Sequence, residues 1–170
     1  MNRVLRGAGC QPTDSAGHGA PQAQSDSGVY ALLIRARTGR RIAIGALGSY
    51  LFPRGLYVYI GSAKRGLRSR IARHRGRKKR LHWHIDYLLR HGQPVAVATF
   101  PWRRGAECRL ARRAAEHGTA QGLVNGFGSS DCRCPTHLFR LPTRPLLGWV
   151  EHVFGPLPQT LAVQALGPRR

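Results

Sequence analysis

Short runs of β-branched and aromatic residues alternate with turn residues along the middle of the chain, and this pattern predicts a small mixed domain. The runs end at glycine, proline or polar clusters, as strands do. They lie at residues 29–34, 41–44, 56–60, 95–100 and 137–141. Because a Thr-Gly-Arg turn separates the first two runs, we expect these to form a hairpin. The last run predicts an edge strand.

Three other segments have the apolar spacing of helices. Residues 67–74 repeat Leu67 and Ile71 four positions apart, and residues 84–90 and 106–117 also place their apolar side chains on one face. The order strand, strand, strand, helix, helix, strand, helix predicts an α+β domain. In this fold class a small antiparallel sheet, here with one inserted hairpin strand, is flanked by helices.

The two ends of the chain differ from this central part in composition. Residues 1–26 are rich in Gly, Gln, Ser, Ala and Pro without a period, and they predict a disordered leader. We expect the folded domain to span residues 27–142 and a proline-rich, weakly structured tail to follow at 143–170. No apolar run is long enough to span a bilayer, so a membrane is not an expected partner.

The charge of the chain predicts a polyanionic partner. The net charge is +21, from 28 basic and 7 acidic residues, and nucleic acid is the usual partner of such a chain. Coding bias can explain arginine in place of lysine, but it does not explain the scarcity of acids. From Arg70 to Arg80, seven of eleven positions are basic. The predicted nucleic-acid-binding residues are Lys64, Arg73, Arg75, Arg77, Lys78, Lys79 and Arg80.

Candidate chemistry gathers where the third predicted strand meets the first helix. The strand ends in Tyr59-Ile60-Gly61, and the helix carries Arg70 and His74, which are four positions apart and share a face. A planar guanidinium binds two phosphate oxygens at once. A phenol with its ordinary pKa of about 10 needs neighbouring cations before it can act as a base.

A divalent cation in such a site needs oxygen ligands, and a carboxylate is the expected anchor. The carboxylates of the predicted domain are Asp86, Glu107, Glu116 and Asp131. Of these, Glu107 shares a helix face with apolar residues, so its side chain is expected to point toward the body of the domain.

The four cysteines are too few for a disulfide scaffold and predict a reducing, cytoplasmic setting. The spacing of Cys132, Cys134 and His137 has two interpretations. One is a Zn²⁺ site, and the other is two small buried side chains in a Gly-Ser loop. Paired zinc cysteines more often have two residues between them, so we favour the second interpretation.

The order of the motifs resembles that of the GIY-YIG nuclease superfamily. The matching residues are Gly28-Val29-Tyr30, Tyr59-Ile60-Gly61, Arg70, His74 and Glu107. Residues 28–139 resemble more closely one archaeal and bacterial branch of it, Domain of Unknown Function 123. The motifs that carry this second resemblance are Gly45-Ala-Leu-Gly48, Gly55-Leu-Tyr-Val-Tyr-Ile-Gly-Ser-Ala63, His82-Trp-His-Ile-Asp-Tyr-Leu-Leu89, Glu107-Cys108 and Gly126-Phe-Gly-Ser-Ser-Asp-Cys-Arg-Cys134.

The superfamily resemblance implies metal-dependent hydrolysis of phosphodiester bonds. It implies that Tyr59 is the general base or passes on the proton of the attacking water, and that Arg70 stabilises the transition state. Glu107 would bind one Mg²⁺ or Mn²⁺, and Tyr30 would help to place the water. His74 matches a helix position that some members use. The chain departs from the usual pattern by an insertion between Tyr30 and Tyr59, which fits only if the two tyrosines still lie on neighbouring strands.

Each of these residues also has an ordinary structural interpretation. Tyr30 and Tyr59 are common strand aromatics, and Glu107 is an acid that the helix dipole favours in a first turn. Arg70 is one of many arginines that can neutralise phosphate, and His74 also fits a solvated helix face. We therefore expect Tyr30, Tyr59, Arg70 and Glu107 to converge on one surface if the resemblance extends to function.

The expected function is a metal-dependent nuclease that acts on DNA rather than RNA, in repair or maintenance, in the cytoplasm at the nucleoid. The sequence shows no base-reading module, so we expect structure-selective or non-specific cleavage. One alternative is a nucleic-acid-binding module with the same fold and little or no catalysis. A second is a zinc-stabilised adaptor that docks RNA or a protein.

Overall fold

The computed structural model describes residues 26–77, 79–116, 121–142, 153–154 and 164–166 of the 170-residue chain. Its helices are a 3-10 helix at Gly45–Leu47, α1 (Leu67–Arg75), α2 (His84–Leu89) and α3 (Ala106–Glu116). Its strands are β1 (Gly28–Ala36), β2 (Arg40–Ala43), β3 (Ser49–Phe52), β4 (Gly55–Ala63), β5 (Gln93–Pro101), β6 (Gln121–Gly122), β7 (Leu138–Arg140) and β8 (Gln164–Ala165). The predicted α+β class and the three predicted helices are confirmed.

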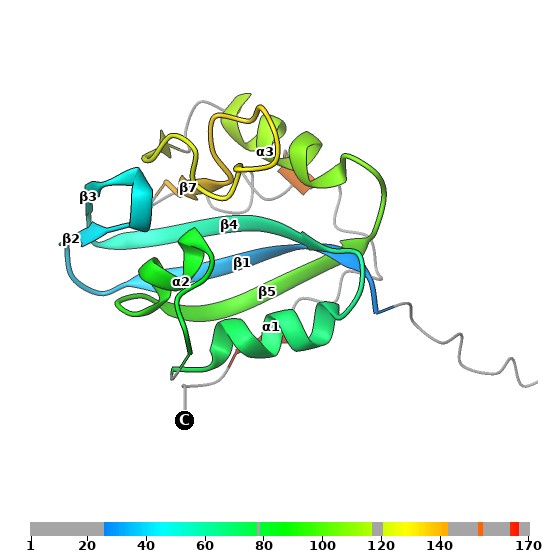
Figure 1. Ribbon diagram of the computed structural model, residues 1–170, viewed down its shortest axis with the longest axis horizontal. Helices are drawn as coiled ribbons and strands as arrows, with labels where there is room; N and C mark the ends of the chain where they lie inside the picture. Colours follow the sequence, from blue (N-terminus) through cyan, green and yellow to red (C-terminus); the bar gives the residue numbers. More distant parts are fainter. Residues whose placement is uncertain (1–25, 78, 117–120, 143–152, 155–163, 167–170) are drawn as a thin grey trace, which may run out of the picture.

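One antiparallel sheet forms the centre of the molecule, with β1, β4 and β5 as its long strands (Figure 1). The strand order is β6-β7-β4-β1-β5-β8, so β1 and β4 are neighbours although an insertion separates them in sequence. In their register Tyr30 lies opposite Gly61, and Leu32 lies opposite Tyr59. The two tyrosines therefore lie on neighbouring strands, as the resemblance requires.

The predicted hairpin between the first two strands is wrong. β2 does not pair with β1 but with β3, and these two strands form a separate sheet. The turn region between them contains Gly45 and Gly48 with φ of 47° and 96°, a backbone that favours glycine. Ile42 and Phe52, one from each strand, are buried in the core. The insertion thus folds back on itself and packs against the domain instead of extending the central sheet.

Two further differences concern the ends of the sheet. The predicted edge strand, β7, lies between β4 and β6 and is therefore not at the edge. β6 and β8 contain two residues each and were not predicted. Strands this short have no detectable period, because only their backbone partners define them.

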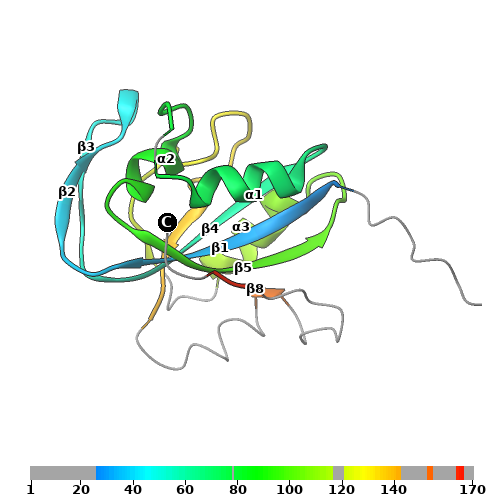
Figure 2. The same ribbon diagram turned by 90° about the horizontal axis from the view of Figure 1, so that it is seen from below.

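The sheet is covered on both faces, which explains why its long strands are apolar throughout. On one face Tyr30, Leu32 and Tyr59 pack with residues of α1 and α2. On the other face Val29 and Ile60 pack with residues of α3. Figure 2 shows α1 and α2 together on one side of the sheet. Each fully buried aliphatic or aromatic side chain contributes about 1.5–3 kcal/mol of hydrophobic stabilisation, so both faces support the fold.

The described residues near the two ends of the chain contact the domain. Asp26, the last residue of the predicted leader, accepts the N–H of Arg68 through its carboxylate at 2.9 Å. In the predicted tail, Val153 is buried in the core beside α3, and the N–H of Leu166 donates to the carbonyl of Val95 at 2.8 Å. The remaining residues of the leader and tail lie outside the described part. Across the described residues, no helix has the length and apolar character needed to cross a membrane.

Candidate functional site

Tyr30, Tyr59 and His74 form a compact aromatic cluster on the face of the sheet that α1 covers. The hydroxyl of Tyr30 lies 2.7 Å from Nε2 of His74. The ring centroids of Tyr30 and Tyr59 are 6.2 Å apart, and those of Tyr59 and His74 are 6.4 Å apart. Tyr30 and His74 are 1% and 0% exposed, whereas Tyr59 is 8% exposed. Tyr59 is therefore the member of the cluster closest to solvent.

Two glycines make room for these tyrosines. A Cβ at Gly61 would lie 2.5 Å from the hydroxyl oxygen of Tyr30, because the tyrosine ring crosses directly over the opposite strand. A Cβ at Gly128 would lie 2.7 Å from the ring of Tyr59. Only glycine allows these close approaches. The glycine of the Tyr-Ile-Gly motif is therefore required because a larger side chain would clash with Tyr30.

Replacing Gly61 with alanine is expected to destabilise the native state by about 1–3 kcal/mol, because the added methyl group displaces Tyr30. Urea unfolding measures this difference. Gly39→Ala is the matched control, since its Cβ would have no neighbour closer than 3.7 Å and should change stability by no more than about 0.5 kcal/mol. Equal effects of the two substitutions would contradict the steric account.

Arg70 lies beside this aromatic cluster. It donates from Nη1 to the carbonyl of Ser62 at 2.9 Å, and its guanidinium lies 4.6 Å from the ring centroid of Trp83. Burial raises the pKa of Tyr30, and the positive charge of Arg70 opposes this rise. The carbonyl of Ser62 and the ring of Trp83 thus hold the guanidinium in place. Its other N–H groups can bind a ligand.

Glu107 approaches the same strand end from α3. One carboxylate oxygen, Oε2, accepts a hydrogen bond from the hydroxyl of Ser62. The other, Oε1, lies 3.0 Å from Nδ1 of His137. The side chain is 23% exposed. The expectation that Glu107 points toward the body of the domain agrees with these contacts.

Among the predicted site residues, Arg70 and Glu107 contact Ser62. The four residues expected on one surface are divided between the two faces of the sheet. Ser62 lies opposite Val29, which belongs to the face that α3 covers. Glu107 therefore meets β4 from the face opposite to Tyr59, and Arg70 meets it from the α1 side. Ser62 was not predicted as a site residue. Its position directly after the Tyr-Ile-Gly motif was the sequence feature that could have indicated it.

The tyrosines are not prepared as bases by the protein groups around them. Burial raises the pKa of Tyr59 well above 10, and the negative charge of Glu107 raises it further, while Arg70 opposes both. Burial likewise raises the pKa of Tyr30. The expected lowering by neighbouring cations is thus outweighed by burial among the described residues. Both phenols are protonated near neutral pH unless a bound cation adds its own charge.

His74 is held as a neutral imidazole. Burial lowers its pKa to about 3, and the neighbouring positive charge of Lys79 acts in the same direction. The interpretation of His74 as part of a solvated helix face is wrong, since the side chain is 0% exposed. Within the described part of the chain, its second ring nitrogen, Nδ1, has no hydrogen-bond partner. A neutral ring beside Tyr30 can share a hydrogen bond with that hydroxyl but cannot attract phosphate by charge.

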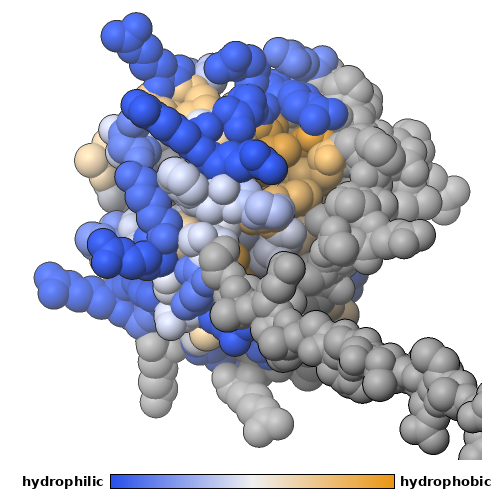
Figure 3. Space-filling view, turned by 90° about the vertical axis from the view of Figure 1, so that its right-hand side faces the viewer, coloured by the Kyte–Doolittle hydropathy of each residue, from blue (hydrophilic) through white to orange (hydrophobic). Residues whose placement is uncertain are grey.

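A cleft of about 470 Å³ opens beside Glu107 at this end of the sheet. Its charged lining residues are Lys64, Arg103, Arg104, Glu107 and Asp131. Figure 3 views this end of the molecule, where hydrophilic side chains dominate the surface that is coloured. Of the five predicted site residues, only Glu107 lines this cleft. Ser62 lines the cleft as well, and it connects the cleft to Arg70 and to the strand that carries Tyr59.

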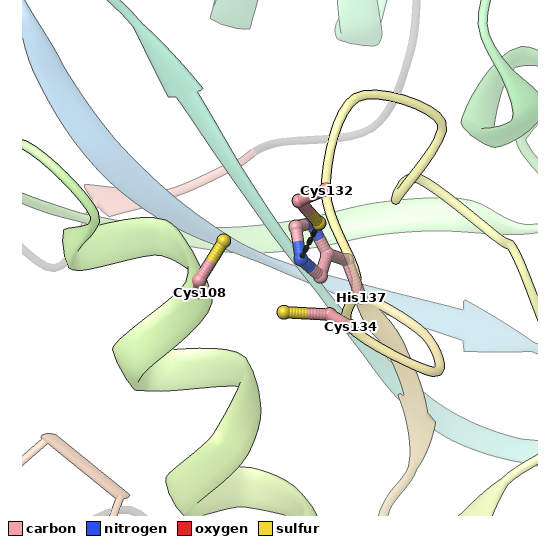
Figure 4. A group of neighbouring side chains, drawn as sticks. All are labelled: Cys108, Cys132, Cys134 and His137. Atoms are coloured by element: carbon pink, nitrogen blue, oxygen red, sulfur yellow. Dashed lines mark hydrogen bonds between the residues drawn. The ribbon is translucent and has the colours of Figure 1, made fainter.

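Three thiols and one imidazole form a second cluster next to Glu107. The ligand atoms of Cys108, Cys132, Cys134 and His137 all lie within 4.8 Å of one another, and Figure 4 shows them converging between α3 and the loop before β7. This group can bind a metal ion. From the sequence we favoured the interpretation that Cys132 and Cys134 are two small buried side chains in a loop. That interpretation does not explain why a third thiol, from α3, lies beside them. Cys108 was missed because only the fold brings it to the Cys-x-Cys loop.

The predicted nucleic-acid-binding residues fall into two groups. Arg73 and Lys79 form ion pairs with the buried Asp86 at 2.9 and 3.4 Å. Burial opposes the charge of Asp86, but hydrogen bonds from Arg73 and from two backbone N–H groups hold its pKa at about 2. The exposed members are Lys64, Arg75, Arg77 and Arg80. Lys78 lies outside the described residues.

The fold and the site define a small α+β domain whose polar residues gather at one end of the central sheet. The family described as Domain of unknown function DUF123 matches residues 29–155. This match spans more than half of the chain, and the chain therefore belongs to that family. It also extends past residue 142, where the sequence predicted the domain to end. There is no match among curated proteins or among solved structures.

Proposed function

We propose that the protein is a metal-dependent nuclease of the GIY-YIG type that hydrolyses phosphodiester bonds in DNA. One observation carries the proposal. Arg70 and Glu107, from helices on opposite faces of the sheet, both bind Ser62, at the end of the strand that carries Tyr59. A guanidinium and a carboxylate held on either side of one residue are the two groups that bind a phosphate and its counter-cation.

The chemistry of the site fits a hard divalent cation. Mg²⁺ and Mn²⁺ take oxygen ligands and are usually bound through one or two carboxylates together with waters and phosphate oxygens. Glu107 and Asp131 line the same cleft and supply two carboxylates, and Ser62 supplies a hydroxyl. When bound, the cation supplies positive charge for the phosphoryl group in the transition state. Arg70 adds a fixed charge for the equatorial oxygens.

The proposed role of Tyr59 is to hold or pass the proton of the attacking water, with Tyr30 placing that water. The 2.7 Å contact between Tyr30 and His74 orients the hydroxyl of Tyr30. Because burial and the charge of Lys79 disfavour a proton on His74, its neutral imidazole holds this hydroxyl by a hydrogen bond and is not the final proton acceptor. We therefore assign the two tyrosines to the attacking water, and Arg70 and Glu107 to charge stabilisation.

The surface supports DNA as the substrate, in repair or maintenance at the nucleoid. Lys64, Arg103 and Arg104 add positive charge to the cleft. Arg75, the last residue of α1, is exposed, and so are Arg77 and Arg80 beyond the helix. Such contacts position phosphates without reading base sequence. We therefore propose cleavage that selects DNA structure or has no sequence preference.

Salt dependence of DNA binding tests the basic surface. Replacing Arg77 and Arg80 together with alanine is expected to reduce the slope of log affinity against log salt by about 2, because each phosphate contact contributes about 0.9. Fluorescence anisotropy with a duplex measures it. Lys79 is left intact because it binds Asp86. Arg109→Ala with Arg112→Ala on α3 is the matched control, and an equal change there would place the binding surface elsewhere.

The direct test of the proposal is a cleavage assay on duplex, branched, flap and single-stranded DNA with Mg²⁺ or Mn²⁺. We expect cleavage that chelation abolishes. If none of the substrates is cleaved, the protein is a nucleic-acid-binding module with the same fold. The enclosed Tyr30 and the raised pKa of Tyr59 are the observations that favour this second candidate.

A further inference from the structure

We propose that Cys108, Cys132, Cys134 and His137 bind one structural Zn²⁺ ion, and that Glu107 holds His137 in the orientation this ion needs. Its four ligands differ from those of the proposed Mg²⁺ or Mn²⁺ site, although the two sites share contact with Glu107, and zinc binding does not depend on nuclease activity. It gives a function to three cysteines that the proposed hydrolysis leaves unused.

The spacing of the ligand atoms fits tetrahedral zinc. With Zn–S bonds of about 2.3 Å and Zn–N bonds of about 2.0 Å, a tetrahedron places its ligand atoms about 3.5–3.8 Å apart. The four ligand atoms here lie within 4.8 Å of one another, and Sγ of Cys132 lies 3.5 Å from Nε2 of His137. The largest separation must shorten by about 1 Å to complete the tetrahedron.

The ligand set selects the ion. Thiolates are soft ligands that favour zinc over Mg²⁺, Mn²⁺ or Ca²⁺, and three thiolates with one imidazole are a common structural zinc set. With a neutral imidazole, the three thiolates and Zn²⁺ carry a net charge of −1. Arg112 and Arg133 line a pocket together with Cys108 and Cys134, so positive charge stands close to this site.

The second nitrogen of His137 supports the assignment independently. A histidine that binds a metal usually donates its other N–H to a carboxylate or carbonyl, which fixes the tautomer and the ring orientation. In His137, Nε2 faces Cys132 while Nδ1 lies 3.0 Å from Oε1 of Glu107. The imidazole is 1% exposed. The contact with Glu107 therefore orients the buried imidazole so that Nε2 points at the thiols.

The position of the site explains what the ion does for the fold. Cys108 lies in the first turn of α3, whereas the other three ligands lie in or directly after a loop that precedes β7. The ion therefore ties α3 to this loop. Gly128 of the same loop packs on the ring of Tyr59, and Asp131 lines the cleft. Through Glu107 the site also reaches Ser62, so the metal supports the end of the sheet where the candidate active site lies.

A disulfide is the main alternative use of these thiols. All three cysteines are free in the structure, and three thiols leave one unpaired in any disulfide arrangement. A buried imidazole fixed by a carboxylate has no role in such a bond. The two states differ in metal content and in thiol titre, so they can be distinguished by experiment.

Metal analysis of the full-length protein tests the site. We expect about one zinc per chain by mass spectrometry after dialysis, and three protected thiols that become reactive when a chelator removes the ion. Cys108→Ser and Cys134→Ser should each lose most of the zinc. Cys10→Ser is the matched control, because Cys10 is the chain's remaining cysteine, and it should keep the full zinc content.

Cobalt binding gives a second test that uses only the wild-type protein, so it does not depend on whether the cysteine variants fold. Co²⁺ added to the metal-free wild-type protein should produce the intense visible absorption of a tetrahedral thiolate site, and Zn²⁺ should displace it. Absence of zinc together with absence of this absorption would overturn the proposal. So would a disulfide among Cys108, Cys132 and Cys134 in protein purified without oxidant.

The role of Glu107 has its own test. Glu107→Gln should lower zinc affinity by about 10–100-fold, measured by competition with a chromophoric chelator, and should change the nitrogen shifts of His137 in NMR spectra. Glu116→Gln at the other end of α3 is the control and should change neither. Unchanged affinity in Glu107→Gln would remove Glu107 from the site. An inactive protein that holds one zinc would refute the nuclease and leave this inference intact.

Discussion

Replacing Tyr59 with phenylalanine is expected to lower metal-dependent cleavage by about 10²–10⁴-fold, the contribution of a positioned acid or base. DNA affinity should change little, because only the hydroxyl is lost. The ring keeps its contacts with His74 and Phe127, whose centroids lie 6.4 and 6.1 Å away. Single-turnover rates with saturating enzyme measure the chemical step apart from binding.

Tyr57→Phe is the matched control for this prediction. Tyr57 lies two residues earlier on β4, on the same face, and its hydroxyl donates to the carbonyl of Pro53 at 2.5 Å. Losing that hydrogen bond should cost about 1 kcal/mol of stability and leave the cleavage rate of the folded protein unchanged. Equal rate losses in the two variants, or none in Tyr59→Phe, would reduce Tyr59 to a packing residue.

The stability of the wild-type protein should fall steeply as the pH drops below about 6.5, because His74 is buried as a neutral ring. Its pKa is about 3 in the native state and 6.5 without the fold. Between these values the unfolded chain binds more protons than the native protein, so stability rises with pH in this window. One such group contributes about 1.4 kcal/mol per pH unit.

The charges around His74 reinforce this effect. Lys79, Arg73 and Arg70 disfavour a proton on the ring, and Asp86 favours one. Tyr30 and Tyr59 face the ring from the sheet. Because burial is the largest cause of the shift, we expect the pH dependence to persist when salt screens the charges.

His74→Gln isolates the contribution of this ring. Urea unfolding from pH 7 to 4 should show that the wild type loses about 3 kcal/mol more than the variant over this range. The amide keeps a polar partner for Tyr30 but does not titrate. His82→Asn, at an exposed histidine, is the control and should follow the wild-type curve. Parallel curves for wild type and His74→Gln would show that His74 does not remain neutral.

Local patterns were sufficient for most elements. The apolar run at residues 29–34 predicted a buried strand, and the four-residue spacing of Leu67 and Ile71 predicted α1. Both patterns arise from side chains a few positions apart, which one element buries together. The motif around Tyr59 likewise identified the strand end where the candidate site lies.

Strand pairing was predicted less well, because it depends on backbone partners far away in sequence. β2 and β3 pair with each other, and β8 pairs with β5 from near the end of the chain. A two-residue strand such as β6 carries no period of its own. The compact insertion is stabilised by burial of Ile42 and Phe52 in the core, which a local window does not show.

The roles of charged and sulfur-containing residues were decided by the tertiary structure. The sequence determined that arginines are abundant, but only the fold shows that Arg73 is bound to Asp86 while Arg77 is exposed. The sequence also supplied Cys132 and Cys134, but only packing of α3 against the loop adds Cys108. A site made of residues from separate segments exists only when the core has fixed their distances, and that is why its composition follows from the three-dimensional structure.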